Sequence, residues 1–407
     1  MTPSFSGSPS VSESLLDRIR PALEREISGA VQLRRRLHEV PDLSGQEGPT
    51  RDIVLAEMPG DLIGMVAGTG ALVRVGGAGP AIGVRAELDA LAVVERTGVP
   101  WASTRSGAMH ACGHDVHLAA LVALCRALQA VPGAVPLVAV LQPREETYPS
   151  GAQDIALSPL LRAQGITAIV GAHVQPTLPR GQVAATPGTV NAAADEFQVV
   201  VRGRGGHAAY PHQTSDPVLA LAHVVVALQR VVSRDVDPTN SAVLGVSTLS
   251  AGTAANVVPD EASARGTVRA LRERTREHVH ARLVEIAELV ARAHGCEATV
   301  EITRGEPVLD NDVALAVRAG ALLTELGLTV SRPLTSFGAD DFSYLSAAYP
   351  GLMMFVGVDG GPGARLHSGD FLPTDDAVRD VAMAMLCGYL AAAERIADDR
   401  LAAQANL

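Results

Sequence analysis

The chain has 407 residues, of which 47% are hydrophobic and 19% are charged, a composition typical of a globular protein with a sizeable core. Its 33 basic and 44 acidic residues give a net charge of −11, which argues against nucleic acid or an anionic membrane as the main partner. Aromatic residues make up only 3%, so aliphatic side chains must fill the core.

The chain begins with "MTPSFSGSPSVSESLLDRIRP", which lacks the charged and apolar regions of a signal peptide. We interpret it as a short disordered lead into a helix. No apolar run reaches membrane-spanning length without charges or breakers. Four cysteines, Cys112, Cys125, Cys296 and Cys387, lack the spacing of a disulfide framework. We therefore expect free thiols and a cytoplasmic protein.

Four short apolar runs predict buried parallel strands, because they do not alternate with polar residues and they end abruptly. These runs lie at 81–88, 135–143, 166–174 and 351–358. A strongly apolar helix is expected at 115–131, with Asp115 able to cap it. Strands that alternate with helices predict an α/β fold with a mixed, mostly parallel sheet flanked by helices.

The middle of the chain has a different pattern, because its strands alternate between apolar and polar residues. The strands are expected at 196–205, 241–252, 262–270 and 296–304, with helices near 215–234 and 272–295. The order β-α-β-β-α-β is that of a ferredoxin-like α+β domain. We therefore predict an inserted domain at 191–305 within a catalytic domain made of 1–190 and 306–407.

Polar side chains follow several of the apolar runs. Asp89 follows the first run, Glu145 and Glu146 follow the second, and His173 closes the third. Any one of these residues could simply mark the end of a strand. Together they favour a ligand site, because ligands bind beyond the carboxyl ends of the strands in an open α/β sheet.

The segment "MHACGHDVH" at 109–117 is the strongest local indication of a metal site. Cys112 and His114 are two residues apart before a helix, so both can face one cation. Cysteine and histidine suit zinc, and imidazole also suits manganese, cobalt or nickel. Asp115 could orient an imidazole instead, and His117 is expected on the helix in a structural role. The alternative is an ordinary helix start with a buried thiol.

The adjacent carboxylates of Glu145 and Glu146 could have two different roles beside a cation. One carboxylate can bind the metal while the other acts as general base on a metal-bound water. The alternative is a solvated charge pair after a strand. His173 in "GAHVQP" and His367 in the Gly-rich "LHSGDFLP" are further candidate ligands.

These residues together resemble the amidohydrolase branch of the aminoacylase and carboxypeptidase metallohydrolases, which includes hippurate hydrolases and indoleacetyl-amino-acid hydrolases. The resemblance covers nearly the whole chain in order. It is carried by "RRRLHEVPDLSGQE", "RAELDALAVVERTGVPWAS", "MHACGHDVH", "QPREE", "GAHVQP", "GRGGHAAYPH", "NVVPDEASARGTVRA", "FGADDFSYL" and "LHSGDF".

The resemblance implies a site with two divalent metal ions, manganese, zinc, cobalt or nickel. Cys112 matches the cysteine that bridges the two ions. Glu145 matches the general base that takes a proton from water and passes it to the leaving nitrogen. Asp89 matches an aspartate that orients a metal-site residue. The remaining metal ligands of the family match His114, Glu146, His173 and His367.

The resemblance also implies that the inserted domain is a lid and dimerisation domain, so a homodimer is expected. His207 matches the lid histidine that steadies the oxyanion, a role that suits an imidazole. Asn256 and Arg269 match positions that hold the substrate, and the planar guanidinium of Arg269 can bind a carboxylate bidentately. The alternative for Arg269 is a surface arginine on a strand.

The chain departs from the family pattern at three motifs. "TYPSGA" replaces a Gly-rich stretch after the glutamate pair, Glu87 replaces an aspartate, and Asp340 replaces a glutamate. The function that we predict is metal-dependent hydrolysis of N-acyl amino acids, or of related conjugates, to a carboxylic acid and a free amino acid. The alternatives are a dipeptidase or carboxypeptidase on the same scaffold and a non-catalytic metabolite-binding homologue.

Overall fold

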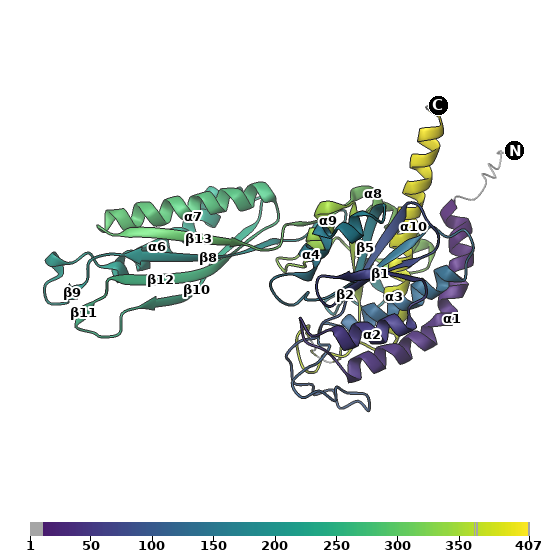
Figure 1. The fold of residues 1–407 in the computed structure, drawn as a ribbon. Helices are drawn as coiled ribbons and strands as arrows, with labels where there is room; N and C mark the ends of the chain where they lie inside the picture. The colour runs from purple at the N-terminus through teal and green to yellow at the C-terminus, as the bar shows by residue number, and fades with distance from the viewer. Residues whose placement is uncertain (1–10, 362, 364, 406–407) are drawn as a thin grey trace. The chain divides into compact units, whose positions relative to one another are not determined.

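The structure is a computed structural model that describes residues 11–361, 363 and 365–405, so most of the expected N-terminal lead lies outside the described residues. The chain divides into two compact units (Figure 1). Unit 1 consists of Met1–Gly188, Asp310–Leu334 and Tyr344–Leu407. Unit 2 consists of Thr189–Leu309 and Thr335–Ser343.

Unit 1 contains an eight-stranded sheet in the order β1-β2-β4-β3-β5-β16-β6-β15. Its strands are β1 (Asp61–Val66), β2 (Gly70–Val75), β3 (Ala81–Glu87), β4 (Leu137–Gln142), β5 (Ile166–Gln175), β6 (Gln182–Ala184), β15 (Thr329–Val330) and β16 (Gly351–Gly357). Strands β4, β3, β5 and β16 run parallel to one another, whereas β1 and β2 pair antiparallel with their neighbours. Strand β6 pairs antiparallel with β16 and parallel with β15. Every residue of β3, β4 and β16 is buried, which confirms the prediction from the non-alternating apolar runs.

Helices cover this sheet and complete an aliphatic core. They are α1 (Val11–Glu39), α2 (Gly48–Glu57), α3 (His114–Gln129), α4 (Gly151–Leu157), α5 (Pro159–Arg162), α8 (Val313–Glu325), α9 (Phe342–Ala348) and α10 (Asp376–Ala405). Helix α3 is buried along nearly its whole length, between α1, α10 and the sheet. The core is built largely of Ala, Val and Leu, as the scarcity of aromatic residues predicted.

The prediction that Asp115 caps α3 is wrong. The helix begins at His114, its N-cap is Gly113, and no side chain caps it. Gly113 has φ 89°, and an added Cβ would lie 2.6 Å from Cγ2 of Val174, so glycine is required there. The Asp115 carboxylate instead accepts a hydrogen bond from Nε of Arg34 at 3.1 Å and lies 3.0 Å from Nδ1 of His38.

Unit 2 is built around a four-stranded antiparallel sheet in the order β10-β12-β8-β13. The elements follow the predicted β-α-β-β-α-β plan, with α6 and α7 on one face of the sheet (Figure 1). This confirms the ferredoxin-like prediction. They are β8 (Ala193–Arg202), α6 (Pro217–Arg230), β10 (Ala242–Ala251), β12 (Glu261–Ala270), α7 (Glu273–Ala293) and β13 (Glu297–Arg304).

Shorter elements complete the chain. They are β7 (Gly188–Asn191), β9 (Gly206–His207), η1 (Pro211–Gln213), η2 (Val231–Asp235), β11 (Val257–Val258) and β14 (Leu309–Asn311). Strand β9 pairs with β11, and β7 pairs with β14. Among the described residues, one helical stretch, Pro217–Asp235, is long and apolar enough to cross a membrane by length and composition alone. Its buried residues, among them Leu221 and Val224, belong to the core of unit 2.

Candidate metal centre

The fold of unit 1 brings the ends of three neighbouring parallel strands to one edge of the sheet. Strands β4, β3 and β5 are adjacent in the sheet. Asp89 follows β3, Glu145 and Glu146 follow β4, and His173 lies near the end of β5. The carboxyl ends of parallel strands meet at the same edge, so the strand order alone draws these side chains together.

Six of the predicted site residues converge at this edge. Ligand atoms of Cys112, His114 and Glu146 all lie within 4.8 Å of one another. Sγ of Cys112 lies 3.4 Å from Nε2 of His173. Nε2 of His367 lies 3.3 Å from Oε1 of Glu146, and Oε2 of Glu145 lies 3.8 Å from Nε2 of His114.

Hydrogen bonds fix which ring nitrogen of two histidines faces the cluster. Nδ1 of His114 lies 2.8 Å from the carbonyl oxygen of Asp89, and Nδ1 of His173 lies 2.7 Å from the carbonyl oxygen of Val174. A carbonyl only accepts, so Nδ1 carries the proton in both rings. In the neutral form of each ring the lone pair is then on Nε2, which is the state in which imidazole binds a metal.

The donor set fits a cation. Nε2 of His114 and Oε1 of Glu146 are buried and 3.9 Å apart. Neither forms a hydrogen bond of good geometry, although Nε2 of His367 comes within 3.3 Å of Oε1 of Glu146. Two buried acceptors that face each other without a donor between them are costly. A divalent cation held by thiolate, imidazole and carboxylate would satisfy both atoms.

The electrostatics of the ligands depend on burial and on their charged neighbours. Burial, together with Glu146 and Glu145, raises the pKa of the Cys112 thiol well above its usual value. Burial opposes ionisation of Glu146, but His367 and His114 lower the pKa of that carboxyl. Burial lowers the pKa of His173 to about 3, so this imidazole is neutral near pH 7 and able to bind a metal.

Asp89 joins two parts of the cluster. Its carbonyl oxygen holds the ring of His114. Its carboxylate accepts hydrogen bonds from the backbone N–H of Glu146 at 3.0 Å and from Oγ of Ser44 at 2.7 Å. Asp89 therefore orients both an imidazole and the glutamate turn.

A second group of possible ligand atoms consists of Glu87, His114, His117 and His173. His117 is already engaged, because its Nδ1 lies 2.8 Å from Glu87 and its Nε2 accepts the N–H of Val174 at 3.0 Å. Burial opposes ionisation of Glu87, but Arg85 and His117 hold the pKa of this carboxyl well below its usual value. His117 and Glu87 thus support the end of β5, in agreement with the structural role expected for His117.

The other predicted site residues belong to unit 2. His207 lies on β9, beside β11, and the N–H of Ala208 donates to the carbonyl of Asn256. Nδ1 of His207 accepts the N–H of Ala209 at 3.1 Å. In the neutral ring the proton is then on Nε2, which can donate to an oxyanion. Arg269 lies on β12, opposite Ala194 and Val243.

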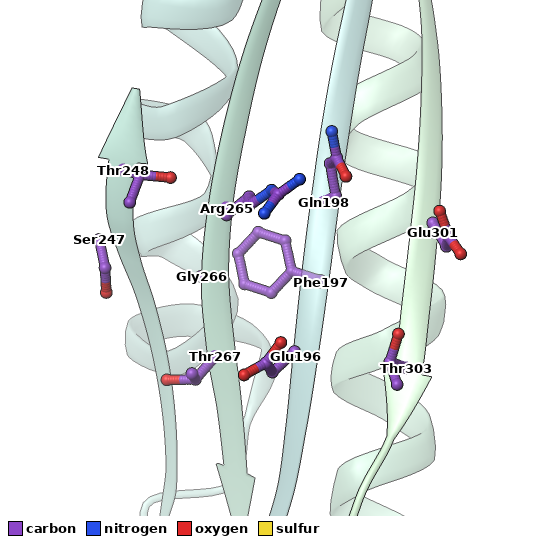
Figure 2. A pocket seen from close by; sticks show the side chains of 10 residues that line it. All are labelled: Glu196, Phe197, Gln198, Ser247, Thr248, Arg265, Gly266, Thr267, Glu301 and Thr303. Atoms are coloured by element: carbon purple, nitrogen blue, oxygen red, sulfur yellow. The ribbon is translucent and has the colours of Figure 1, made fainter. Parts of the chain in front are cut away.

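A cavity of about 450 Å³ lies on the open face of the unit 2 sheet (Figure 2). Arg265, Glu196 and Glu301 are among its lining side chains, and it contains no histidine or cysteine. Gly266 in its floor leaves room for the ring of Phe197, since an added Cβ would lie 2.6 Å from the ring. The cavity lacks soft metal ligands and a general base paired with them, so we do not identify it as the catalytic site.

Several buried residues that support the metal centre were not predicted from the sequence. Glu47 is fully buried and contacts the backbone beside Glu145. His38 and Arg34 surround the carboxylate of Asp115, next to His114 in the chain. Both Glu47 and His38 lie in "RRRLHEVPDLSGQE", a stretch that carried the family resemblance but no assigned chemistry. The available indication for His38 was its position at helical spacing from the buried residues Ala30, Leu33 and Leu37 on one face of α1.

The sequence profile of peptidase family M20/M25/M40 matches residues 83–390. An N-acetyl-L-cysteine deacetylase of Bacillus subtilis is 36% identical over 347 residues, which cover 83% of this chain and 82% of that protein. An N-acetyldiaminopimelate deacetylase of Bacillus pumilus is 33% identical over 366 residues, 88% of this chain and 96% of that protein. The crystal structure of a dinuclear metal-binding peptidase of the M20 family from Bacillus subtilis has a TM-score of 0.79 and 28% identity, and the match covers 91% of this chain and 98% of that chain.

Proposed function

Because the chain belongs to peptidase family M20/M25/M40, we propose that it is a metal-dependent amidohydrolase that cleaves N-acyl amino acids to a carboxylic acid and a free amino acid. The family resemblance inferred from the motifs is confirmed, and the chain is an enzyme that acts on amide bonds. The observation that carries the mechanism is the convergence of thiol, imidazole and carboxylate donors with Glu145 beside them.

Two divalent ions, which we propose to be manganese, zinc, cobalt or nickel, are expected at this site. The residues that would hold them are Cys112, His114, Glu146, His173 and His367. Such ions supply Lewis acidity, which polarises an amide carbonyl and lowers the pKa of a bound water to about 7. The orphaned acceptors on His114 and Glu146 support this assignment.

Glu145 is the proposed general base. It takes a proton from the attacking water and gives it to the departing nitrogen, and its position 3.8 Å from His114 supports this role. His207 is proposed to donate from Nε2 to the developing oxyanion, which its hydrogen bond from Ala209 supports. Asn256 and Arg269 are proposed to bind the substrate, with Arg269 on its carboxylate.

We propose that two copies of the chain associate through unit 2. Strand β10 is an edge of the four-stranded sheet and exposes Val243 and Leu249. Helix α6 exposes Leu219 and Val226. An edge strand with exposed apolar side chains is a template for pairing, and a second copy can extend the sheet. The free state of all four cysteines supports a reducing compartment, the cytoplasm.

The proposal is tested by a turnover screen on metal-reconstituted protein, read by release of free amine. The panel contains N-acetyl-L-cysteine, N-acetyldiaminopimelate, N-benzoylglycine and several dipeptides. We expect hydrolysis of acyl amino acids, loss of turnover with bound metal retained in Glu145→Gln, and loss of metal in Cys112→Ala. Wild-type turnover by Glu145→Gln would refute the role of this base. Preference for dipeptides would favour a peptidase.

A further inference from the structure

Glu47 stands immediately before α2, where a side chain normally caps the first turn of a helix. It is fully buried, yet its carboxylate makes no hydrogen bond to α2. Asp42 caps α2 instead, because its Oδ2 accepts the N–H of Thr50 in the first turn at 2.8 Å. The carboxylate of Glu47 is therefore available for another part of the chain.

The carboxylate of Glu47 bonds to three donors from separate segments. Its Oε1 accepts the N–H of Gly45 at 2.8 Å and the N–H of Arg144 at 2.9 Å. Its Oε2 accepts the hydroxyl of Thr69 at 2.5 Å. A buried carboxylate with this number of donors is well satisfied and held in one orientation.

The contact with Arg144 falls at a strained point of the glutamate turn. Arg144 has φ 52°, a left-handed conformation that costs free energy for a residue with a Cβ. Its carbonyl accepts the N–H of Gly151 at 3.1 Å, and its guanidinium donates to the carbonyl of Pro149 at 2.7 Å. The surrounding hydrogen bonds thus hold the residue in a conformation that it would otherwise leave.

Glu145 is consequently fixed from both sides. The N–H of the preceding residue, Arg144, is held by Glu47, and the N–H of the following residue, Glu146, is held by Asp89 at 3.0 Å. Both acceptors are buried carboxylates from segments far away in sequence. Between these two anchors the backbone of Glu145 has little freedom, so the direction of its side chain is set.

We propose that Glu47 is a positioning residue for the general base Glu145 and that it acts through the N–H of Arg144. This inference rests on the proposed function, in which Glu145 moves the proton. The role requires reach rather than charge: an acceptor oxygen must stand within hydrogen-bonding distance of Arg144. An electrostatic role would instead require the negative charge.

Two substitutions separate reach from charge. Glu47→Gln keeps the length of the side chain, and its amide can accept from Arg144 through oxygen and donate to Thr69 through nitrogen. Glu47→Asp keeps the charge but is one methylene shorter and cannot reach the N–H of Arg144. Glu57→Asp is the matched control, because it shortens a glutamate at the other end of the same helix that pairs with Arg36 and Arg126 rather than with the glutamate turn.

The experiment measures kcat and KM for N-acetyl-L-cysteine, bound metal, and amide hydrogen exchange of the peptide around residues 143–147. Glu47→Asp is expected to lower kcat about 100-fold, as a misplaced catalytic group does. Its KM and metal content stay near those of the wild type, and exchange in 143–147 becomes faster. Glu47→Gln and Glu57→Asp keep most of the wild-type kcat and the slow exchange. If Glu47→Asp does not fold, Thr69→Val, which frees Oε2 of Glu47, is expected to lower kcat and speed exchange by smaller factors.

The opposite ranking, with Glu47→Asp active and Glu47→Gln inactive, would overturn the proposal in favour of an electrostatic role. Wild-type kcat and slow exchange in Glu47→Asp would overturn it as well, as would unchanged kcat in Thr69→Val if that variant has to be used. Glu145→Gln in the same assay distinguishes failure of the positioning role of Glu47 from failure of the proposed function. If Glu145→Gln is inactive while Glu47→Asp is active, only the positioning role fails. If Glu145→Gln is active, the proposed function itself fails.

Discussion

His38 is expected to be a charged group inside the folded protein, and its replacement by glutamine should destabilise unit 1 in a pH-dependent way. Nδ1 of His38 lies 3.0 Å from Asp115, and its Nε2 lies 3.2 Å from Glu95. Burial alone would lower the pKa of His38, but Asp115 and Glu95 together outweigh it and raise the pKa from 6.5 to about 9. Arg34 also forms an ion pair with Asp115, at 3.1 Å.

The size of the effect follows from proton linkage. A group whose pKa is higher in the folded state stabilises the fold fully below its unfolded pKa and loses that contribution as the pH rises through its folded pKa. For a shift from 6.5 to about 9, the contribution is about 3 kcal/mol at pH 6, about 2 kcal/mol at pH 7.5 and close to zero at pH 10. The pKa values of His110 and His173 are lowered to about 3, so these histidines change the free energy of unfolding at pH values below the range of this experiment.

The assay is urea unfolding of metal-free wild type and His38→Gln between pH 7.5 and pH 10. At each pH, the free energy of unfolding of His38→Gln is subtracted from that of the wild type. Groups that titrate in the same way in both proteins cancel in this difference, so its pH dependence reports residue 38. We expect this difference to shrink by about 2 kcal/mol over the range. Trp101, the single tryptophan, lies 5.1 Å from the His38 ring and should report deprotonation near pH 9 in the native state. If the free energies of unfolding of the wild type and His38→Gln differ by the same amount at pH 7.5 and pH 10, His38 does not have the raised pKa.

Three further substitutions test other parts of the account. Gly151→Ala should destabilise the protein by at least about 2 kcal/mol in urea unfolding, because its Cβ would stand 1.8 Å from the carbonyl oxygen of Pro143; an unchanged midpoint would contradict this close approach. Arg276→Met should cost about 3 kcal/mol of unfolding free energy, since it leaves the buried carboxylate of Asp195 without its main partner, and a neutral effect would show that the pair is dispensable. Leu249→Asp on β10 should shift the mass measured by light scattering from two chains to one, whereas an unchanged mass would place the contact elsewhere.

Much of the fold could be predicted from the sequence because each local pattern agrees with its environment. The mainly apolar, non-alternating runs of β3, β4 and β16 are buried on both faces, and the alternating run of β12 has one open face. The prediction of Asp115 as a helix cap was wrong because its carboxylate contacts Arg34 and His38 inside the core. These contacts stabilise the carboxylate more than the first turn of α3 would.

The metal-site candidates could be selected because cysteine, histidine and carboxylate side chains recur after several predicted strands and in one short motif at 109–117. The residues behind them could not be selected in the same way. The partners of Glu47 are two backbone N–H groups, one of them 97 residues away, and the hydroxyl of Thr69, and a sequence pattern does not indicate such contacts. Its role becomes visible only when the left-handed backbone of Arg144 is seen beside it.

We propose that one cluster in unit 1 binds the catalytic metal ions. Anomalous scattering from crystals grown with manganese would locate these ions. We expect two peaks, bounded by Cys112, His114, Glu146, His173 and His367, with Glu145 facing them and outside their coordination. Peaks at other residues, or Glu145 bound as a ligand or turned away from the peaks, would contradict this proposal.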